Sequence, residues 1–305
     1  MRNAFAQIVT ELAVTNPRLV LLAGDIGNRL FDRFKEQFPQ RFYNCGVAEA
    51  GMTGIAAGLA ASGLQPITYT ITPFNTLRCL EQIRLDVCYP DLPVILVGTG
   101  SGLSYASLGA THHSMEDIGA LRMLPNMHVV CPADTMEVKS LIAAALELRR
   151  PTYIRLGKKG EPQIHHQPPA LVIGKGYTIR EGSDLAVIGV GNLLAEALKC
   201  ADLLQEKSIT TRVISWHTVK PIDDSLLSEL FASFAKIIVL EEHGYAGGVG
   251  SSILEWGSRQ GVDLRKLKCF AGADQFLSAC GNQQQAREFL GLTANQIVPQ
   301  LLEWL

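Results

Sequence analysis

The sequence predicts an α/β protein made of two domains. Short apolar runs of strand length alternate with longer segments that carry apolar residues at helical spacing, which is typical of parallel sheets covered by helices. The chain has 305 residues, more than one compact domain usually holds. Residues 157–169 include three prolines and two glycines and have no apolar period, as in a connection between domains. We therefore expect a first domain over residues 1–160, a linker over 161–172 and a smaller second domain over 173–305.

The first half should form a mostly parallel sheet sandwiched by helices. Its first fourteen residues place Phe5, Val9 and Leu12 on one helical face. Apolar runs then predict strands at residues 18–24, 66–71, 93–99, 128–131 and 152–156. Helices are expected between them, over residues 48–62, 74–88, 115–124 and 134–149.

The second half repeats the alternation on a smaller scale. Strands are expected at residues 185–190, 211–215 and 236–240. Helices are expected at residues 193–205 and 224–234, after Gly248, and at the end of the chain up to Leu305.

Composition excludes several classes of function. A formal charge of -2 without clustered Lys and Arg argues against binding of nucleic acid or an anionic membrane. No run of 18 apolar residues and no cleavable signal segment is present, so a cytoplasmic protein is expected. The seven cysteines never occur as CxxC, which predicts buried reduced thiols rather than disulfides or a metal site.

Glu49 is the most informative ionisable residue, because it opens an otherwise small and apolar segment. The run that contains it, Phe38-Pro-Gln-Arg-Phe-Tyr-Asn-Cys-Gly-Val-Ala-Glu49, resembles the pyrimidine-domain signature of the transketolase family. Further matches follow in the family's order: Asp25, Phe74, GATHH at 109–113, LRMLPN at 121–126, PADTME at 132–137, KPID at 220–223 and EEHGYAGGVGS at 241–251. The resemblance covers nearly the whole chain.

The resemblance implies that the protein works with thiamine diphosphate and that Glu49 is the acid–base partner of this cofactor. Thiamine reacts through C2 of its thiazolium ring, which loses its proton to a group on the pyrimidine. That group becomes basic when the opposite ring nitrogen, N1′, is protonated, and a carboxylate hydrogen-bonded to N1′ in a dry pocket supplies this proton. On the residues alone, Glu49 is equally an acid favoured by the dipole at a helix N-terminus.

The same resemblance implies further site residues. Phe74 would stack on the pyrimidine, with Ile71 and Leu77 as an apolar wall, although Ile71 and Leu77 are equally ordinary core residues. His112 aligns with a histidine that contacts the sugar and moves protons to its oxygens, and His113 stands beside it in place of a Gln. Lys158 and Arg29 fall near phosphate-binding positions of the family.

Other positions depart from the family pattern, and they concern the sugar. Leu108 stands where an Asp commonly binds a sugar hydroxyl, and Gly100 stands where a phosphate-binding His is found. Ala50 replaces the Gln or His that usually follows the Glu. The sequence therefore supports the cofactor half of the site better than the substrate half.

The GDG motif and later Asn that hold Mg²⁺ and the diphosphate in this family are missing, since Gly24-Asp25 is followed by Ile26. A separate diphosphate-binding subunit that carries GDG and Asn is therefore expected. The chain would then be the C-terminal subunit of an α2β2 transketolase that moves a two-carbon ketol unit. The alternatives are the β subunit of a 2-oxoacid dehydrogenase and a non-catalytic stabilising subunit. GATHH and the run Gly157–Gly160 favour the transketolase.

Two glycine-rich runs carry weaker signals. Residues 189–194 follow a strand as a dinucleotide-binding motif does, but the sixth position is Leu and no acid ends the next strand. Residues 247–251 could hold an anion at a helix N-terminus or simply make a tight turn. We expect no metal ligands within this chain.

Overall fold

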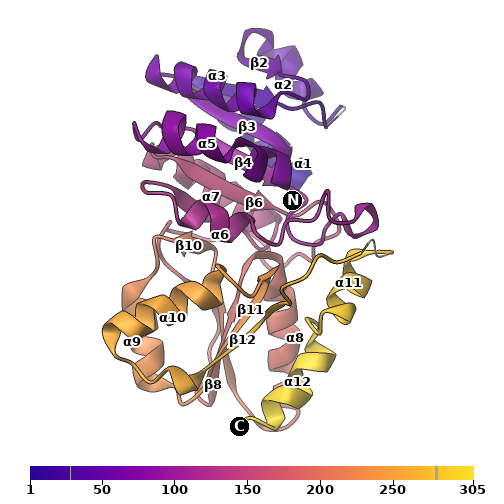
Figure 1. Cartoon of the computed structure of the whole chain (residues 1–305), viewed down its shortest axis with the longest axis vertical. Helices are drawn as coiled ribbons and strands as arrows, with labels where there is room; N and C mark the ends of the chain where they lie inside the picture. Colours follow the sequence, from indigo (N-terminus) through magenta and orange to yellow (C-terminus); the bar gives the residue numbers. More distant parts are fainter. Residues whose placement is uncertain (28, 279–280) are drawn as a thin grey trace.

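The computed structural model describes residues 1–27, 29–278 and 281–305 and has two α/β domains, one above the other in Figure 1. Asn28 and Cys280 lie outside the described residues. The first sheet has seven strands in the order β10-β5-β6-β4-β3-β1-β2, all parallel to their neighbours except β10. These strands are β1 (Leu19–Ala23), β2 (Phe42–Asn44), β3 (Gln65–Ile71), β4 (Ile95–Thr99), β5 (His128–Val130), β6 (Thr152–Leu156) and β10 (Thr218–Lys220).

Helices cover both faces of this sheet, as Figure 1 shows. They are α1 (Arg2–Thr15), α2 (Asp32–Gln37), α3 (Glu49–Ala61), α4 (Thr72–Asn75), α5 (Leu80–Gln82), α6 (Asp117–Arg122) and α7 (Thr135–Leu148), with a π-helical segment at Ile83–Cys88. Side chains alternate along each strand, so Leu19 and Leu21 of β1 pack with α1 and α7, whereas Val20 and Leu22 pack with α3. Burial on both faces explains why the central strands are continuous apolar runs.

The second sheet has five strands in the order β12-β11-β8-β9-β7, with only β7 antiparallel to its neighbour. Its strands are β7 (Tyr177–Arg180), β8 (Leu185–Gly189), β9 (Thr211–Ser215), β11 (Ile237–Gly244) and β12 (Leu267–Gly272). Its helices are α8 (Leu194–Gln205), α9 (Asp224–Ser233), α10 (Val249–Gln260), α11 (Gln283–Phe289) and α12 (Ala294–Leu302). One buried cluster holds α8 and α12 on one face, and another holds α9 and α10 on the other.

The two domains share more than a linker. Strand β10 follows β9 in the chain but pairs with β5 of the first sheet, where Thr218 lies opposite Val130. A single buried apolar cluster also continues from α3 through α6 to Trp216 and Trp256 of the second domain. The boundaries at residues 160 and 173 stay a prediction, because the chain crosses back into the first sheet after them.

A buried ion pair of the first domain lies at this interface and also contacts the second domain. The side chains of Arg155 on β6 and Asp117 in α6 are 2% and 0% exposed, and Arg155 Nε lies 2.7 Å from Asp117 Oδ2. Arg155 also donates to the carbonyl oxygens of Ser114 and Glu242, and Tyr153 donates its hydroxyl proton to Asp117. Burial alone would raise the pKa of Asp117, but Arg155 holds it below its ordinary value, so the carboxylate stays charged.

Asp134 fastens the connection between the domains. One of its carboxylate oxygens caps the first turn of α7, and the other accepts hydrogen bonds from the backbone of Ile164 and His165. Glu137, in the same turn, accepts a hydrogen bond from the hydroxyl of Ser215 on β9. The PADTME motif at 132–137 is therefore a joint between the connection, α7 and the second sheet.

Glu242 on β11 fastens the second domain to the loop that follows β4. Its Oε1 accepts hydrogen bonds from the backbone nitrogen of Leu103 and from Gln283, each at 2.7 Å, and its Oε2 accepts one from Arg287. The neighbouring Glu241 accepts hydrogen bonds from the first backbone N–H groups of α10. The paired glutamates thus cap a helix and hold a loop of the other domain.

The predicted strands of the first half are present within two residues of their expected ends. The prediction of one continuous helix over 74–88 was wrong. The segment is divided into α4, a 3-10 turn, α5 and the π-helical segment. The break follows Asn75, whose buried side chain donates to Thr68 Oγ1 and Val97 O. The short edge strands β2, β7, β10 and β12 were not expected.

None of the six described cysteines forms a disulfide, and Cys45 and Cys269 are only partly buried. Within the described ranges, no helix is both long and apolar enough to cross a membrane.

We expect Asp117→Asn to lower the free energy of unfolding by about 3–5 kcal/mol, because it leaves the Arg155 charge buried without its partner. Urea denaturation followed by tryptophan fluorescence measures this loss. Asp32→Asn is the matched control, since Asp32 pairs with Lys35 at 3.3 Å on the surface and should change stability by less than about 0.5 kcal/mol. Equal effects of the two substitutions would contradict a structural role for the buried pair.

Candidate active site

Glu49 is the first residue of α3 and is 3% exposed. The chain reaches this position by leaving β2 through Gly46, whose φ of 66° favours glycine, and turning directly into the helix. Oε2 of Glu49 lies 2.7 Å from Nη1 of Arg78. Its Oε1 accepts no hydrogen bond from any part of the chain that the structure describes. A buried carboxylate with one unused oxygen is therefore available at the start of α3.

Arg78 connects this carboxylate to two flat side chains. Its guanidinium carbon lies 4.1 Å from the centre of the Phe74 ring, so the cation covers one face of that ring. The Phe74 ring meets His112 edge to face, with 5.3 Å between ring centres. Glu49, Arg78, Phe74 and His112 thus form one continuous row at the edge of the first domain.

Tyr105 extends the row toward Lys158. Its ring centre lies 5.8 Å from that of His112 and 4.4 Å from Nζ of Lys158. Gly100 makes room for this ring: its φ is 79°, and a side-chain carbon there would lie 1.9 Å from Tyr105. Burial, with a contribution from His113, lowers the pKa of His112, which keeps its imidazole neutral at neutral pH.

Three other predicted residues lie around this row in different ways. Ile71 ends β3 and is 8% exposed, whereas Leu77 is 42% exposed. His113 is 6% exposed, and its Nε2 lies 3.2 Å from the carbonyl oxygen of Ala106, inside its own loop. Ile71 therefore belongs to the core, Leu77 presents an apolar side chain to solvent, and His113 is turned away from the row.

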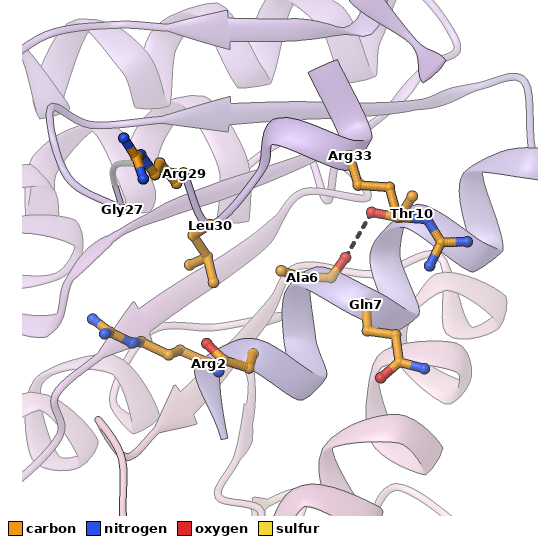
Figure 2. Close-up of a pocket in the computed structure, with 9 residues that line it drawn as sticks. Arg2, Ala6, Gln7, Thr10, Gly27, Arg29, Leu30 and Arg33 are labelled. Atoms are coloured by element: carbon orange, nitrogen blue, oxygen red, sulfur yellow. Dashed lines mark hydrogen bonds between the residues drawn. The ribbon is translucent and has the colours of Figure 1, made fainter. Parts of the chain in front are cut away.

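Arg29 lies at a separate cavity of about 540 Å³ between α1, α2 and the loop after β1. Arg2 and Arg33 also line it, but the three guanidinium groups do not converge: Figure 2 shows Arg33 at one end and Arg2 and Arg29 at the other. Burial and nearby cations, Arg2 among them, lower the pKa of Lys158. Arg2 therefore lines the cavity and also lies near enough to Lys158 to lower the pKa of that side chain.

Two domain profiles match the chain. Residues 1–162 match the transketolase pyrimidine binding domain, and residues 174–297 match the transketolase C-terminal domain. The chain belongs to the transketolase family. This family consists of thiamine-diphosphate enzymes, so its members' cofactor is the one to test against the residues described above.

Named transketolase subunits are similar to the chain over nearly its full length. An apulose-4-phosphate transketolase subunit of Phocaeicola vulgatus is 31% identical over 100% of this chain and 97% of its own. A 6-deoxy-6-sulfo-D-fructose transketolase subunit of Clostridium sp. MSTE9 is 33% identical over 98% of this chain and 92% of its own. A solved structure described as a split gene transketolase, inactive beta4 tetramer, superposes with a TM-score of 0.89 at 33% identity, covering 99% of this chain and 97% of that one.

The transketolase cofactor fits the residues at the start of α3. The unused Oε1 of Glu49 can meet a ring nitrogen, and the partly exposed ring of Phe74 offers a face for an aminopyrimidine. His112 packs edge to face against the same Phe74 ring, so an ionisable imidazole lies next to it.

Arg78 and Tyr105 were not predicted as site residues from the sequence. Arg78 follows Phe74 by four residues, a spacing that would place the two side chains on one face of the helix expected over 74–88, but the structure brings them together across the break after Asn75. Tyr105 is the one aromatic residue in the glycine-rich stretch 100–113. Both signals were present in the sequence, but only the fold brings these two side chains to Glu49 and His112.

Proposed function

We propose that this chain is the pyrimidine-binding subunit of a two-chain transketolase that transfers a two-carbon ketol unit from a ketose to an aldehyde. The observation that carries the proposal is the buried carboxylate of Glu49, connected through Arg78 to the ring of Phe74, in a chain of this family. A partner subunit with the GDG and Asn ligands holds Mg²⁺ and the diphosphate. The complex contains two copies of each chain and is cytoplasmic.

Glu49 and Phe74 bind and orient the cofactor's pyrimidine. Thiamine diphosphate, when bound, supplies the reactive carbon and the electron sink. Glu49 holds a proton at N1′ through the oxygen that has no partner in the described chain, and Phe74 stacks on the ring. Ile71 supports this wall from the core, and Leu77 extends it toward the partner subunit.

His112 moves protons at the sugar oxygens. Thr111 Oγ1 lies 2.9 Å from its Nδ1, which leaves Nε2 for the substrate. The lowered pKa of His112, caused first by burial, keeps the ring neutral and able to accept a proton. His113 steadies the loop through its contact with Ala106, and a direct contact between His113 and the substrate stays a prediction.

Lys158 holds an anionic end of the sugar, and a contact of Arg29 with the same anion stays a prediction, because Arg29 lines the separate cavity. Lys158 lies at the end of the row beyond Tyr105, and Arg2 adds positive charge between Lys158 and the cavity that Arg29 lines. The relatives named above act on sugars whose names carry a phosphate or a sulfo group. Point charges of this kind attract an anion without fixing its orientation as tightly as a paired guanidinium does.

The alternatives have less support. A β subunit of a 2-oxoacid dehydrogenase would share the two domains, but the named full-length relatives described above are transketolase subunits. A non-catalytic stabilising subunit would not need a buried carboxylate with one oxygen unused in the described chain.

Purified alone, the chain should lack ketol-transferase activity and bind thiamine diphosphate weakly, because the diphosphate and Mg²⁺ ligands belong to the partner. Titration calorimetry with Mg²⁺ measures binding before and after addition of a chain that carries GDG and a later Asn. Tight Mg²⁺-dependent binding without that second chain would refute the two-chain proposal.

Glu49→Gln in the assembled complex should slow C2 deprotonation by at least about two orders of magnitude, the scale of a lost proton transfer. Hydrogen–deuterium exchange at C2, followed by NMR, reports this step directly. Glu81→Gln serves as the control, since Glu81 is an exposed acid paired with Arg84 on the same domain. Exchange within a few-fold of wild type would rule out the assigned role of Glu49.

The substrate should be a modified sugar rather than a common pentose or hexose phosphate. Leu108, which is 49% exposed in this chain, cannot accept a hydrogen bond from a sugar hydroxyl, and a hydroxyl left unpaired there once the complex buries it costs about 1–3 kcal/mol. Gly100 cannot be replaced by a phosphate-binding side chain, since Tyr105 fills the space beside it. We expect higher kcat/KM for deoxy or branched ketoses with an anionic end than for xylulose 5-phosphate and fructose 6-phosphate.

One further variant measures how much the anionic group of the sugar contributes to kcat/KM. Lys158→Met should lower kcat/KM for anionic ketoses and leave that for uncharged ketoses unchanged. If the common sugar phosphates are the best substrates of the wild-type complex, the altered positions do not set specificity and the substrate proposal is wrong.

A further inference from the structure

Arg78 makes both of the contacts that the proposed function assigns to the cofactor's pyrimidine. Its Nη1 is 2.7 Å from Oε2 of Glu49, and its guanidinium carbon is 4.1 Å from the centre of the Phe74 ring. A protonated aminopyrimidine is also flat, donates to a carboxylate and stacks on an aromatic face. One side chain therefore presents the same two features to the same two residues.

The Arg78 side chain is held only lightly in this position. It is 45% exposed, whereas its partner Glu49 is 3% exposed. Apart from Glu49 and the Phe74 ring, no residue in the described ranges makes a hydrogen bond or ring contact with it. An ion pair with one exposed partner is weak because water solvates the free cation well. Arg78 can thus swing into solvent, and Glu49 is the group that loses most from its departure.

We propose that Arg78 is an internal stand-in for the pyrimidine, which pairs with Glu49 and covers Phe74 until the cofactor displaces it. The inference rests on the proposed function, since it needs a pyrimidine at this site. The stand-in satisfies a carboxylate that would otherwise be buried without a partner in the free chain. It also lowers the apparent affinity for the cofactor, because only the fraction of molecules with Arg78 swung out is competent to bind.

The affinity of the assembled complex tests this competition. Titration with thiamine diphosphate at saturating Mg²⁺ should give about five- to tenfold tighter binding for Arg78→Gln than for wild type, the effect of removing one exposed ion pair and one cation–π contact. Arg78→Lys keeps the charge and loses the flat stacking group, so its affinity should lie between the two. Arg84→Gln is the control, because Arg84 pairs with the exposed Glu81 at 3.4 Å on the same domain and should bind as wild type does.

A second measurement reports the role of Arg78 without any cofactor. In the chain alone, Arg78→Gln should lower Tm because Glu49 loses its partner, and adding Glu49→Gln should restore much of that loss. If the assembled Arg78→Gln complex binds the cofactor no more tightly than the wild-type complex does, Arg78 is not a competitor and the inference is overturned. If the wild-type complex itself shows no Mg²⁺-dependent binding, the proposed function fails first and takes the inference with it.

Discussion

The geometry of the site depends on the buried pair of Arg155 and Asp117. The Arg155 guanidinium is fixed by both oxygens of Asp117 and by two backbone carbonyls, one at Ser114 and one at Glu242. These contacts come from β6, α6, the end of the loop that carries His112, and β11 of the other domain. Because a buried charge must stay paired, α6 cannot move away from β6 without leaving an ion unpaired in an apolar interior, and the hydrogen bond to the Glu242 carbonyl ties β11 of the second domain to the same guanidinium. The loop is thereby clamped at the end that follows His112.

The second domain holds the loop at its other end. Glu242 accepts a hydrogen bond from the backbone of Leu103, and the isolated bridge between Gly102 and Ser114 closes the loop on itself. The stretch between these points is thus short enough to set Tyr105 against His112. The family motifs of the second domain mostly make contacts with the first domain, as Glu242 and Lys220 do. The second domain therefore stabilises a loop of the first domain.

The central strands could be predicted because their sequence signals are strong and local, whereas the edge strands have weak signals and were missed. Strands such as β1, β4 and β8 are buried on both faces, so each is an unmistakable apolar run. The edge strands β2 and β10 are three residues long and form only because a neighbouring strand is already in place. For the site, the motif that ends at Glu49 predicted the acid, and a separate family match predicted Phe74. Arg78 and Tyr105 were not predicted as site residues, because their contacts depend on which side chains the fold brings next to them.

The surroundings of Glu49 explain how half of a site can exist in one chain. Val47 is 80% exposed, Ile55 on α3 is 52% exposed and Leu77 is 42% exposed, although the carboxylate of Glu49 at the start of α3 is buried. Large apolar side chains are costly to leave in water, and the exposure of three of them on α3 and the segments near it in the sequence agrees with a surface that the proposed partner subunit covers. In the proposed complex the diphosphate-binding subunit would exclude water from this surface. Burial of Glu49 by its own chain and burial of the surrounding rim by the partner would then be separate steps, so that the dry environment required for proton transfer arises only on assembly.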